Sequence, residues 1–223
     1  MRLRNVAGRG EEKVRDVTKF VIAVEGAKAE RLYFERFEDS ARLYIKTLPP
    51  EGVADGKSDP LQTLQRLNAY IAENEEDFLP CDTFWLVCDR DDREVSKFHQ
   101  AIEAAKSSRF KYETILSNPC FELWLHLHFA DYPEHKQAQL AEMPLKERPR
   151  QMKQDLHEAC EGKGLDQCSV ADFGSRLQAA IKRAKALDKA PETPIPDCPS
   201  TRLYLLTECL LELCPRYKER PAP

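Results

Sequence analysis

Four short apolar runs alternate with helical patterns in the first part of the chain, and this alternation constrains the fold more than any other feature. The apolar runs cover residues 19–24, 43–48, 83–88 and 112–116. Between them, apolar residues recur every three or four positions, which predicts helices over 28–37, from Asp59 onward, and over 94–106. Alternating strands and helices form a parallel sheet with right-handed crossovers. The sequence therefore predicts an α/β fold with a four-stranded parallel sheet flanked by helices.

Two of the apolar runs end in carboxylates. Glu25 follows the first run, and Asp89 and Asp91 follow the third. Ligands bind open parallel sheets at the carboxyl ends of the strands, and alternate residues of an extended chain face the same way. Converging carboxylates repel each other unless a divalent cation lies between them. We therefore expect Glu25, Asp89 and Asp91 to hold Mg²⁺ or Mn²⁺ for phosphodiester chemistry; the alternative is that the aspartates only cap the next helix.

Glu30, Asn118 and Glu122 are candidates for the second half of this site. Glu30 lies in the first turns of the helix after Glu25, where the helix dipole alone would also favour a carboxylate. Asn118 follows the fourth strand and so should share the sheet edge with the acids, unless it caps a helix. Glu122 is a candidate catalytic carboxylate, because it begins an apolar helix where a charge needs a partner. His126 and His128, two residues apart, share a helix face poorly and are expected to be structural.

The bulk composition indicates one compact cytoplasmic unit. The chain has 223 residues with a net charge of −4, and no apolar stretch approaches the ~20 residues of a membrane span. Four of the eight cysteines, Cys88, Cys120, Cys209 and Cys214, lie in apolar segments, and the sequence has no Cys-x-x-Cys pair, so reduced thiols are expected. Residues 1–17 are read as a flexible basic arm, 18–130 as the α/β core, and 131–223 as a helical extension packed on the core. Within the extension, helices are expected over 149–160, 172–188 and 200–213.

Basic residues concentrate in two parts of the extension, 146–153 and 176–189. Such local patches can neutralise phosphates although the whole chain is acidic. Solvated helix faces explain the same pattern equally well.

Several motifs together resemble the RloB (AbiLii-like) family. They are Val24-Glu25-Gly26-Ala27-Lys28-Ala29-Glu30 with Tyr33-Phe34, Val87 to Asp92, Ser117 to Phe129, and Pro199-Ser200-Thr201 with Leu203 and Leu206. The resemblance implies a Toprim-like core, a place in bacterial phage-defence loci, and an ABC/SMC-like ATPase as partner. It also implies that Glu25 is a metal ligand or general acid/base and that Asp89 and Asp91 are metal ligands.

The resulting expectation is a Mg²⁺-dependent nuclease effector of abortive infection, cleaving RNA such as tRNA, or DNA. The alternative is a non-catalytic subunit that binds an ATPase partner or a nucleotide. A homodimer is compatible with both, and a membrane is not among the expected partners. A primase-like transferase would need further domains, such as a zinc module, that this sequence lacks.

Overall fold

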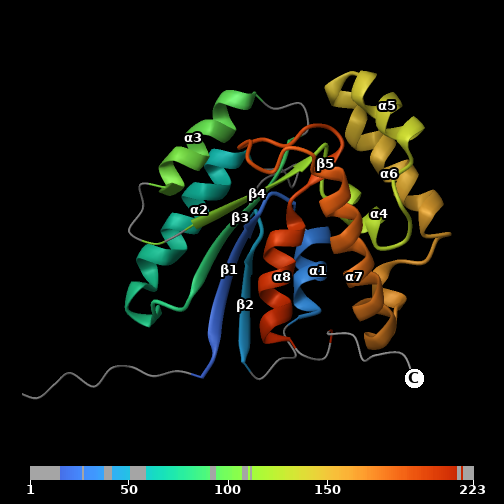
Figure 1. Ribbon diagram of the computed structural model, residues 1–223. Coiled ribbons are helices and arrows are strands. Elements are labelled where there is room, and N and C mark those ends of the chain that lie inside the picture. The colour runs from blue at the N-terminus through green and yellow to red at the C-terminus, as the bar shows by residue number, and fades with distance from the viewer. Residues whose placement is uncertain are drawn as a thin grey trace, which may run out of the picture.

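The computed structural model describes residues 16–26, 28–37, 42–50, 59–90, 94–106, 110, 112–214 and 217 (Figure 1). Its centre is a five-stranded sheet in the order β2-β1-β3-β4-β5. The first four strands are parallel, and β5 pairs with β4 in the antiparallel sense. The strands are β1 (Thr18–Val24), β2 (Leu43–Leu48), β3 (Thr83–Asp89), β4 (Tyr112–Asn118) and β5 (Ser200–Thr201).

The predicted α/β class is confirmed, and the arrangement is consistent with a Toprim-like fold. The four parallel strands lie within two residues of their predicted bounds. The sheet differs from the prediction in its fifth strand, which falls at the start of the helix predicted over 200–213. A two-residue strand carries no periodicity of its own, and only its pairing with β4 defines it.

Helices cover both faces of the sheet (Figure 1). On one face, α2 and α3 pack apolar side chains such as Leu67 and Phe98 against Ala23 and Leu86 of the strands. The opposite face carries a larger core that joins β1 and β3 to the C-terminal helices. The helices are α1 (Ala29–Glu35), α2 (Pro60–Glu73), α3 (Val95–Lys106), α4 (Glu122–Leu127), α5 (Glu134–Glu142), α6 (Arg148–Ala159), α7 (Val170–Leu187) and α8 (Leu203–Leu213).

The start of α2 shows how local sequence defines an element. Asp59 accepts a hydrogen bond from the Gln62 backbone N–H at 2.9 Å, and the Gln62 side chain accepts one from the Asp59 N–H at 3.1 Å. Pro60 at the first helical position needs no such partner because it has no N–H. This capping box satisfies two of the donors that every helix start leaves open, so α2 begins where the sequence predicts.

The C-terminal region contains one helix that the sequence pattern does not reveal. In α5 only Leu140 is buried, so the apolar stripe that predicts a helix is missing. Short 3₁₀ turns at Glu75–Asp77, Leu145–Glu147 and Leu165–Gln167 connect neighbouring elements. No described helix is both long and apolar enough to cross a membrane. Residues 1–15 of the predicted basic arm lie outside the described part of the chain.

Candidate active site at the carboxyl edge of the sheet

The strand order places the topological switch point of the sheet between β1 and β3. The chain passes from β1 to β2 on one side and then crosses to β3 on the other, so the connections diverge at this point. Crevices at such divergence points are the usual binding sites of open α/β sheets. Val24 pairs with Val87 across the two strands. Glu25, directly after Val24, and Asp89, at the end of β3, therefore follow neighbouring strand ends.

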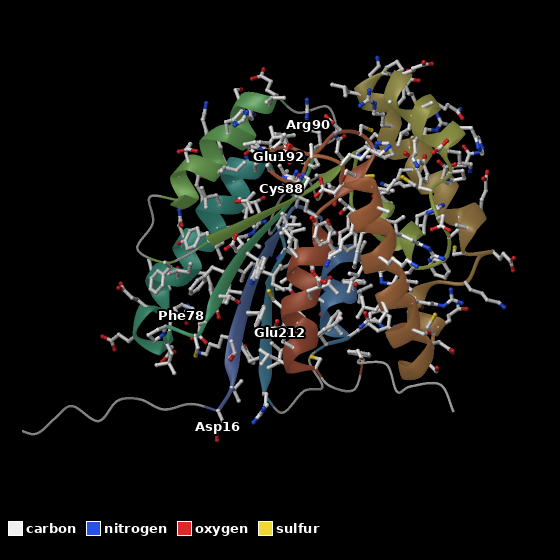
Figure 2. All side chains as sticks on the ribbon, viewed as in Figure 1. Asp16, Phe78, Cys88, Arg90, Glu192 and Glu212 are labelled. Carbon is white, nitrogen blue, oxygen red and sulfur yellow. The ribbon has the colours of Figure 1, made fainter. Side chains whose placement is uncertain are left out.

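Figure 2 shows which chain segments gather at this end of the sheet. Cys88 of β3 and Arg90, which follows that strand, lie there, together with Glu192 of the proline-rich segment 191–199. Asp16 and Phe78 lie toward the opposite end. The carboxyl edge is thus formed by strand ends and by the chain that precedes β5.

The predicted acids are not all described. The Glu25 side chain is 5% exposed and Asp89 is partly buried. Asp91, the third predicted ligand, lies outside the described residues. Among the residues that are described, no three histidine, cysteine or acidic side chains are grouped to hold a metal ion. The grouping of Glu25, Asp89 and Asp91 around one cation stays a prediction.

Glu30 turns back toward the end of β1. Its Oε1 accepts a hydrogen bond of 2.9 Å from the Gly26 N–H, and the side chain is only 5% exposed. Burial raises the pKa of the Glu30 carboxyl above its ordinary value, backbone N–H groups partly offset this, and the nearby Glu122 carboxylate raises it further. Glu30 is therefore a buried carboxyl group that keeps its proton more readily than an exposed one.

Gly26 leaves room for this carboxyl group. A Cβ atom at position 26 would lie 2.1 Å from Glu30 Oε2 and 2.3 Å from Oε1, distances that no real contact allows. The glycine after the strand-end acid thus leaves the space that the Glu30 carboxyl group occupies in its hydrogen bond to the Gly26 N–H.

Replacing Gly26 with alanine is expected to lower the free energy of unfolding by about 2 kcal/mol, because the new methyl group displaces the buried Glu30 side chain. The cost should shrink to a few tenths of a kcal/mol in a Glu30→Ala background, where the obstructing carboxyl group is gone. Urea unfolding of the two single variants and the double variant measures this coupling. Equal costs in both backgrounds would show that Glu30 does not explain the glycine.

Glu122 is the second acid of this cluster, and its partner comes from the helical extension. Lys153 of α6 places its Nζ 3.5 Å from Glu122 Oε1, and both charges act on Glu30. Three helices, α1, α4 and α6, thus bring Glu30, Glu122 and Lys153 together. The sequence marked Lys153 only as part of the basic stretch 146–153, so its pairing was missed.

Asn118 lies at the end of β4, as predicted, but it does not cap a helix. The residue that precedes α4 is Phe121, and it makes no side-chain cap. Asn118 instead donates from Nδ2 to the Pro196 carbonyl at 2.9 Å. The side chain is 7% exposed, and its Oδ1 has no hydrogen-bond partner within the described structure. A buried oxygen of this kind calls for a cation or a hydrogen-bond donor.

The β4–β5 pairing supplies further polar groups beside Asn118. Ser200 is its direct partner in the ladder and is 1% exposed. On the other face, the hydroxyls of Ser117 and Thr201 are hydrogen-bonded at 2.8 Å. The short strand missed by sequence patterns therefore completes the carboxyl edge of the sheet.

Arg66 of α2 hydrogen-bonds to the strand ends from the face of the sheet that α2 and α3 cover. Its Nη2 donates to the Val24 carbonyl at 2.6 Å and its Nε to the Leu48 carbonyl at 3.2 Å. The contact fixes the ends of β1 and β2 directly before Glu25. Arg90 also turns to this face, with its guanidinium carbon 5.7 Å from the centre of the Phe98 ring. The apolar spacing of α2 gives no signal for the role of Arg66.

The two histidines of the α4 region lie in the core. The His128 Nδ1 lies 2.9 Å from the Trp124 carbonyl oxygen, and its Nε2 lies 3.3 Å from the Tyr33 hydroxyl. Burial lowers the pKa of His128 to about 3 and that of His126 to about 4. Both rings are neutral at physiological pH, as expected for structural residues.

The donor atoms at the carboxyl edge suit a hard divalent cation. Glu25, Asp89 and Asn118 supply only oxygen donors, which Mg²⁺ and Mn²⁺ prefer over nitrogen or sulfur. The unsatisfied Oδ1 of Asn118 is buried at the same edge. The residues present therefore fit such an ion.

The fold and this edge define an α/β protein with acidic side chains at the carboxyl ends of two neighbouring parallel strands. The RloB-like protein family model matches residues 20–210. The chain thus belongs to the RloB-like family, which confirms the resemblance seen in its motifs. No curated protein and no solved structure matches it.

Proposed function

We propose that this RloB-like protein is a Mg²⁺-dependent nuclease that cleaves phosphodiester bonds of RNA, such as tRNA, or of DNA. Its setting is anti-phage abortive infection, with an ABC/SMC-like ATPase as partner. The observation that carries the proposal is the position of Glu25 and Asp89 on neighbouring strand ends, where the chain connections of the sheet diverge. The proposed role in phage defence is based on the motifs that the chain shares with the RloB-like family.

The roles follow from the position of each side chain. Glu25 and Asp89, with Asp91, would hold the cation, and Asn118 would add its amide oxygen. The bound ion would polarise the scissile phosphoryl group and lower the pKa of bound water. Glu30, with its raised pKa, can hold or return a proton at the leaving oxygen. Lys153, whose side chain is 62% exposed, can contact a phosphate without leaving Glu122.

The test compares wild type with Glu25→Gln and Asp89→Asn, each purified with the ATPase subunit and mixed with end-labelled RNA and DNA in Mg²⁺. We expect each substitution to slow cleavage at least ~100-fold, because a carboxylate ligand is lost while the side-chain volume stays nearly the same. Glu208→Gln serves as the matched control, since Glu208 forms a surface ion pair with Lys185 on the α8 side.

Cleavage at wild-type rate by both site variants would refute the nuclease proposal. Phage protection in cells gives the second measurement. If the acid variants protect as well as wild type, the protein acts as the non-catalytic subunit of an ATPase complex instead.

A further inference from the structure

The outer side of β2 is an open edge of the sheet. Among the described strands, β2 pairs with β1 alone, because it stands at one end of the strand order (Figure 1). A groove of about 820 Å³ runs along the whole of β2, between side chains of α1 and α2. Tyr44 is 48% exposed on this strand. An edge strand of this kind presents backbone N–H and C=O groups to which a further strand can pair.

The register of the sheet identifies these backbone groups. The Thr18 N–H donates to the Arg42 carbonyl at 3.0 Å, and successive residues of a strand point their backbone groups to opposite sides. The N–H and C=O groups of Leu43, Ile45 and Thr47 therefore point away from β1. The usual protections of an edge are a proline or a β-bulge. β2 has neither, since its sequence contains no proline and its register with β1 is continuous.

The side chains of β2 form two rows. Leu43 and Ile45 are buried in the core on the α1 face. Tyr44 and Lys46 alternate with them and face α2, where the Lys46 Nζ lies 5.9 Å from the centre of the Tyr70 ring. The open edge thus carries an exposed aromatic ring and a cation two residues apart on one face.

We propose that β2 pairs antiparallel with β2 of a second copy of this chain, about a two-fold axis at Ile45. Ile45 then faces Ile45 of the second copy, and Leu43 faces Thr47. Each of these three residues donates one hydrogen bond and accepts one, so the outward backbone groups of both strands are matched. The dimer does not depend on nuclease activity.

The side chains favour a second copy over an unrelated strand because they are self-complementary. With the axis at Ile45, Tyr44 lies opposite Lys46 of the second copy, which pairs an aromatic ring with a cation twice. Arg31 and Glu35, an ion pair on α1, line the same groove. The two-fold axis reverses this pair, so the basic end in one copy faces the acidic end in the other.

The antiparallel pairing also fixes where the two candidate sites lie. Strand direction reverses across the axis, so the carboxyl edges of the two copies lie at opposite ends of one continuous sheet. Each copy therefore keeps its own Glu25 and Asp89.

The first test measures the register by disulfide cross-linking. Positions 44 and 46 of opposite copies form a non-hydrogen-bonded pair with Cα atoms about 4.5 Å apart, within disulfide reach. Two copies of position 44 are diagonal neighbours, about 7–8 Å apart, and cannot be bridged without backbone movement. Mixing Tyr44→Cys protein with Lys46→Cys protein under mild oxidation should give a linked dimer, and each variant alone should not. Mass spectrometry of the linked peptide separates this bond from any made by the native cysteines.

The second test weakens the pairing. Tyr44→Lys places like charges opposite each other twice, and the dimer dissociation constant measured by analytical ultracentrifugation should rise at least about 10-fold. Leu205→Lys is the matched control, because Leu205 of α8 is 42% exposed and does not line the groove. It should dissociate like wild type, and circular dichroism should show both variants folded.

Three results would overturn the dimer. One is a wild-type protein that stays monomeric at the highest concentration tested. Another is a mixture of the two cysteine variants that cross-links no more than either alone, or a Tyr44→Lys dimer as tight as that of Leu205→Lys. The third is a cysteine at position 44 that links only to the ATPase subunit, since the occupant of the edge would then be that partner. Loss of cleavage in Glu25→Gln with the dimer intact would leave both proposals standing separately.

Discussion

Replacing Arg202 with methionine is expected to lower the free energy of unfolding by about 3 to 5 kcal/mol, because it leaves a buried carboxylate without its cation. Arg202 and Asp188 are each 8% exposed. The Arg202 Nε donates to Asp188 Oδ2 at 3.0 Å, and its Nη2 donates to the Ala190 carbonyl at 2.8 Å. A second guanidinium nitrogen donates to the Thr193 carbonyl. The Arg202 side chain thus neutralises the buried Asp188 carboxylate and also hydrogen-bonds to the backbone near the proline-rich segment.

Urea unfolding measures this cost. The matched control is Arg31→Met, which removes a surface pair with Glu35 whose side chains are 41% and 36% exposed, and should cost less than about 1 kcal/mol. Replacing both members, as in Asp188→Leu with Arg202→Met, should recover part of the loss because no buried charge remains. An Arg202→Met variant as stable as Arg31→Met would show that the buried pair does not stabilise the fold.

The Arg202→Met variant is also expected to affect the candidate site. Arg202 holds the segment that carries Pro196, and the Pro196 carbonyl accepts the Asn118 amide hydrogen bond. If the segment is released, Asn118 loses the contact that orients its Oδ1. Arg202 is therefore a positioning residue for the carboxyl edge, at a distance from any reacting atom.

Acidification from pH 7 to pH 5 is expected to reduce the free energy of unfolding by about 4 kcal/mol through His126 and His128 together. Burial lowers their pKa values to about 4 and about 3 in the folded protein, whereas both titrate near 6.5 when unfolded. The unfolded chain therefore takes up these protons first as the pH falls. Stability is retained above pH 6.5 and is lost progressively as the pH falls from there toward the folded pKa values.

Charged side chains around each histidine ring also shift its pKa. Arg176, Arg183 and Arg36 act on His128, and each opposes a positive charge there. Asp155 acts on His126 in the opposite sense. Glu30 opposes the loss of stability on acidification, because its raised pKa means that the folded protein binds this proton more tightly than the unfolded chain does. A comparison between variants isolates the histidines from these effects.

The measurement is the free energy of unfolding of wild type and His128→Phe at pH 7 and pH 5. The variant should lose about 2 kcal/mol less than wild type over this interval, since one titrating ring is gone. His135→Gln, at an exposed position of α5, should follow wild type. Identical pH dependence in wild type and His128→Phe would mean that His128 does not resist protonation in the fold.

Local patterns in the sequence determined the elements and their class. The alternation of apolar runs with helical spacing defined four parallel strands and most of the helices, because side-chain periodicity is a property of a few consecutive residues. The capping box at Asp59 placed the start of α2 for the same reason. The strand-end acids Glu25 and Asp89, and the motifs of the RloB-like family, were also readable without coordinates.

Only the tertiary structure decided which of these groups meet. The order β2-β1-β3-β4-β5 made the ends of β1 and β3 neighbours, and helix packing joined Glu122 to Lys153 across 31 positions of the chain. The contacts of Asn118 with Pro196 and of Arg66 with Val24 likewise span 78 and 42 positions. Such contacts depend on how the elements pack, and no periodicity within one segment encodes a partner so far along the chain.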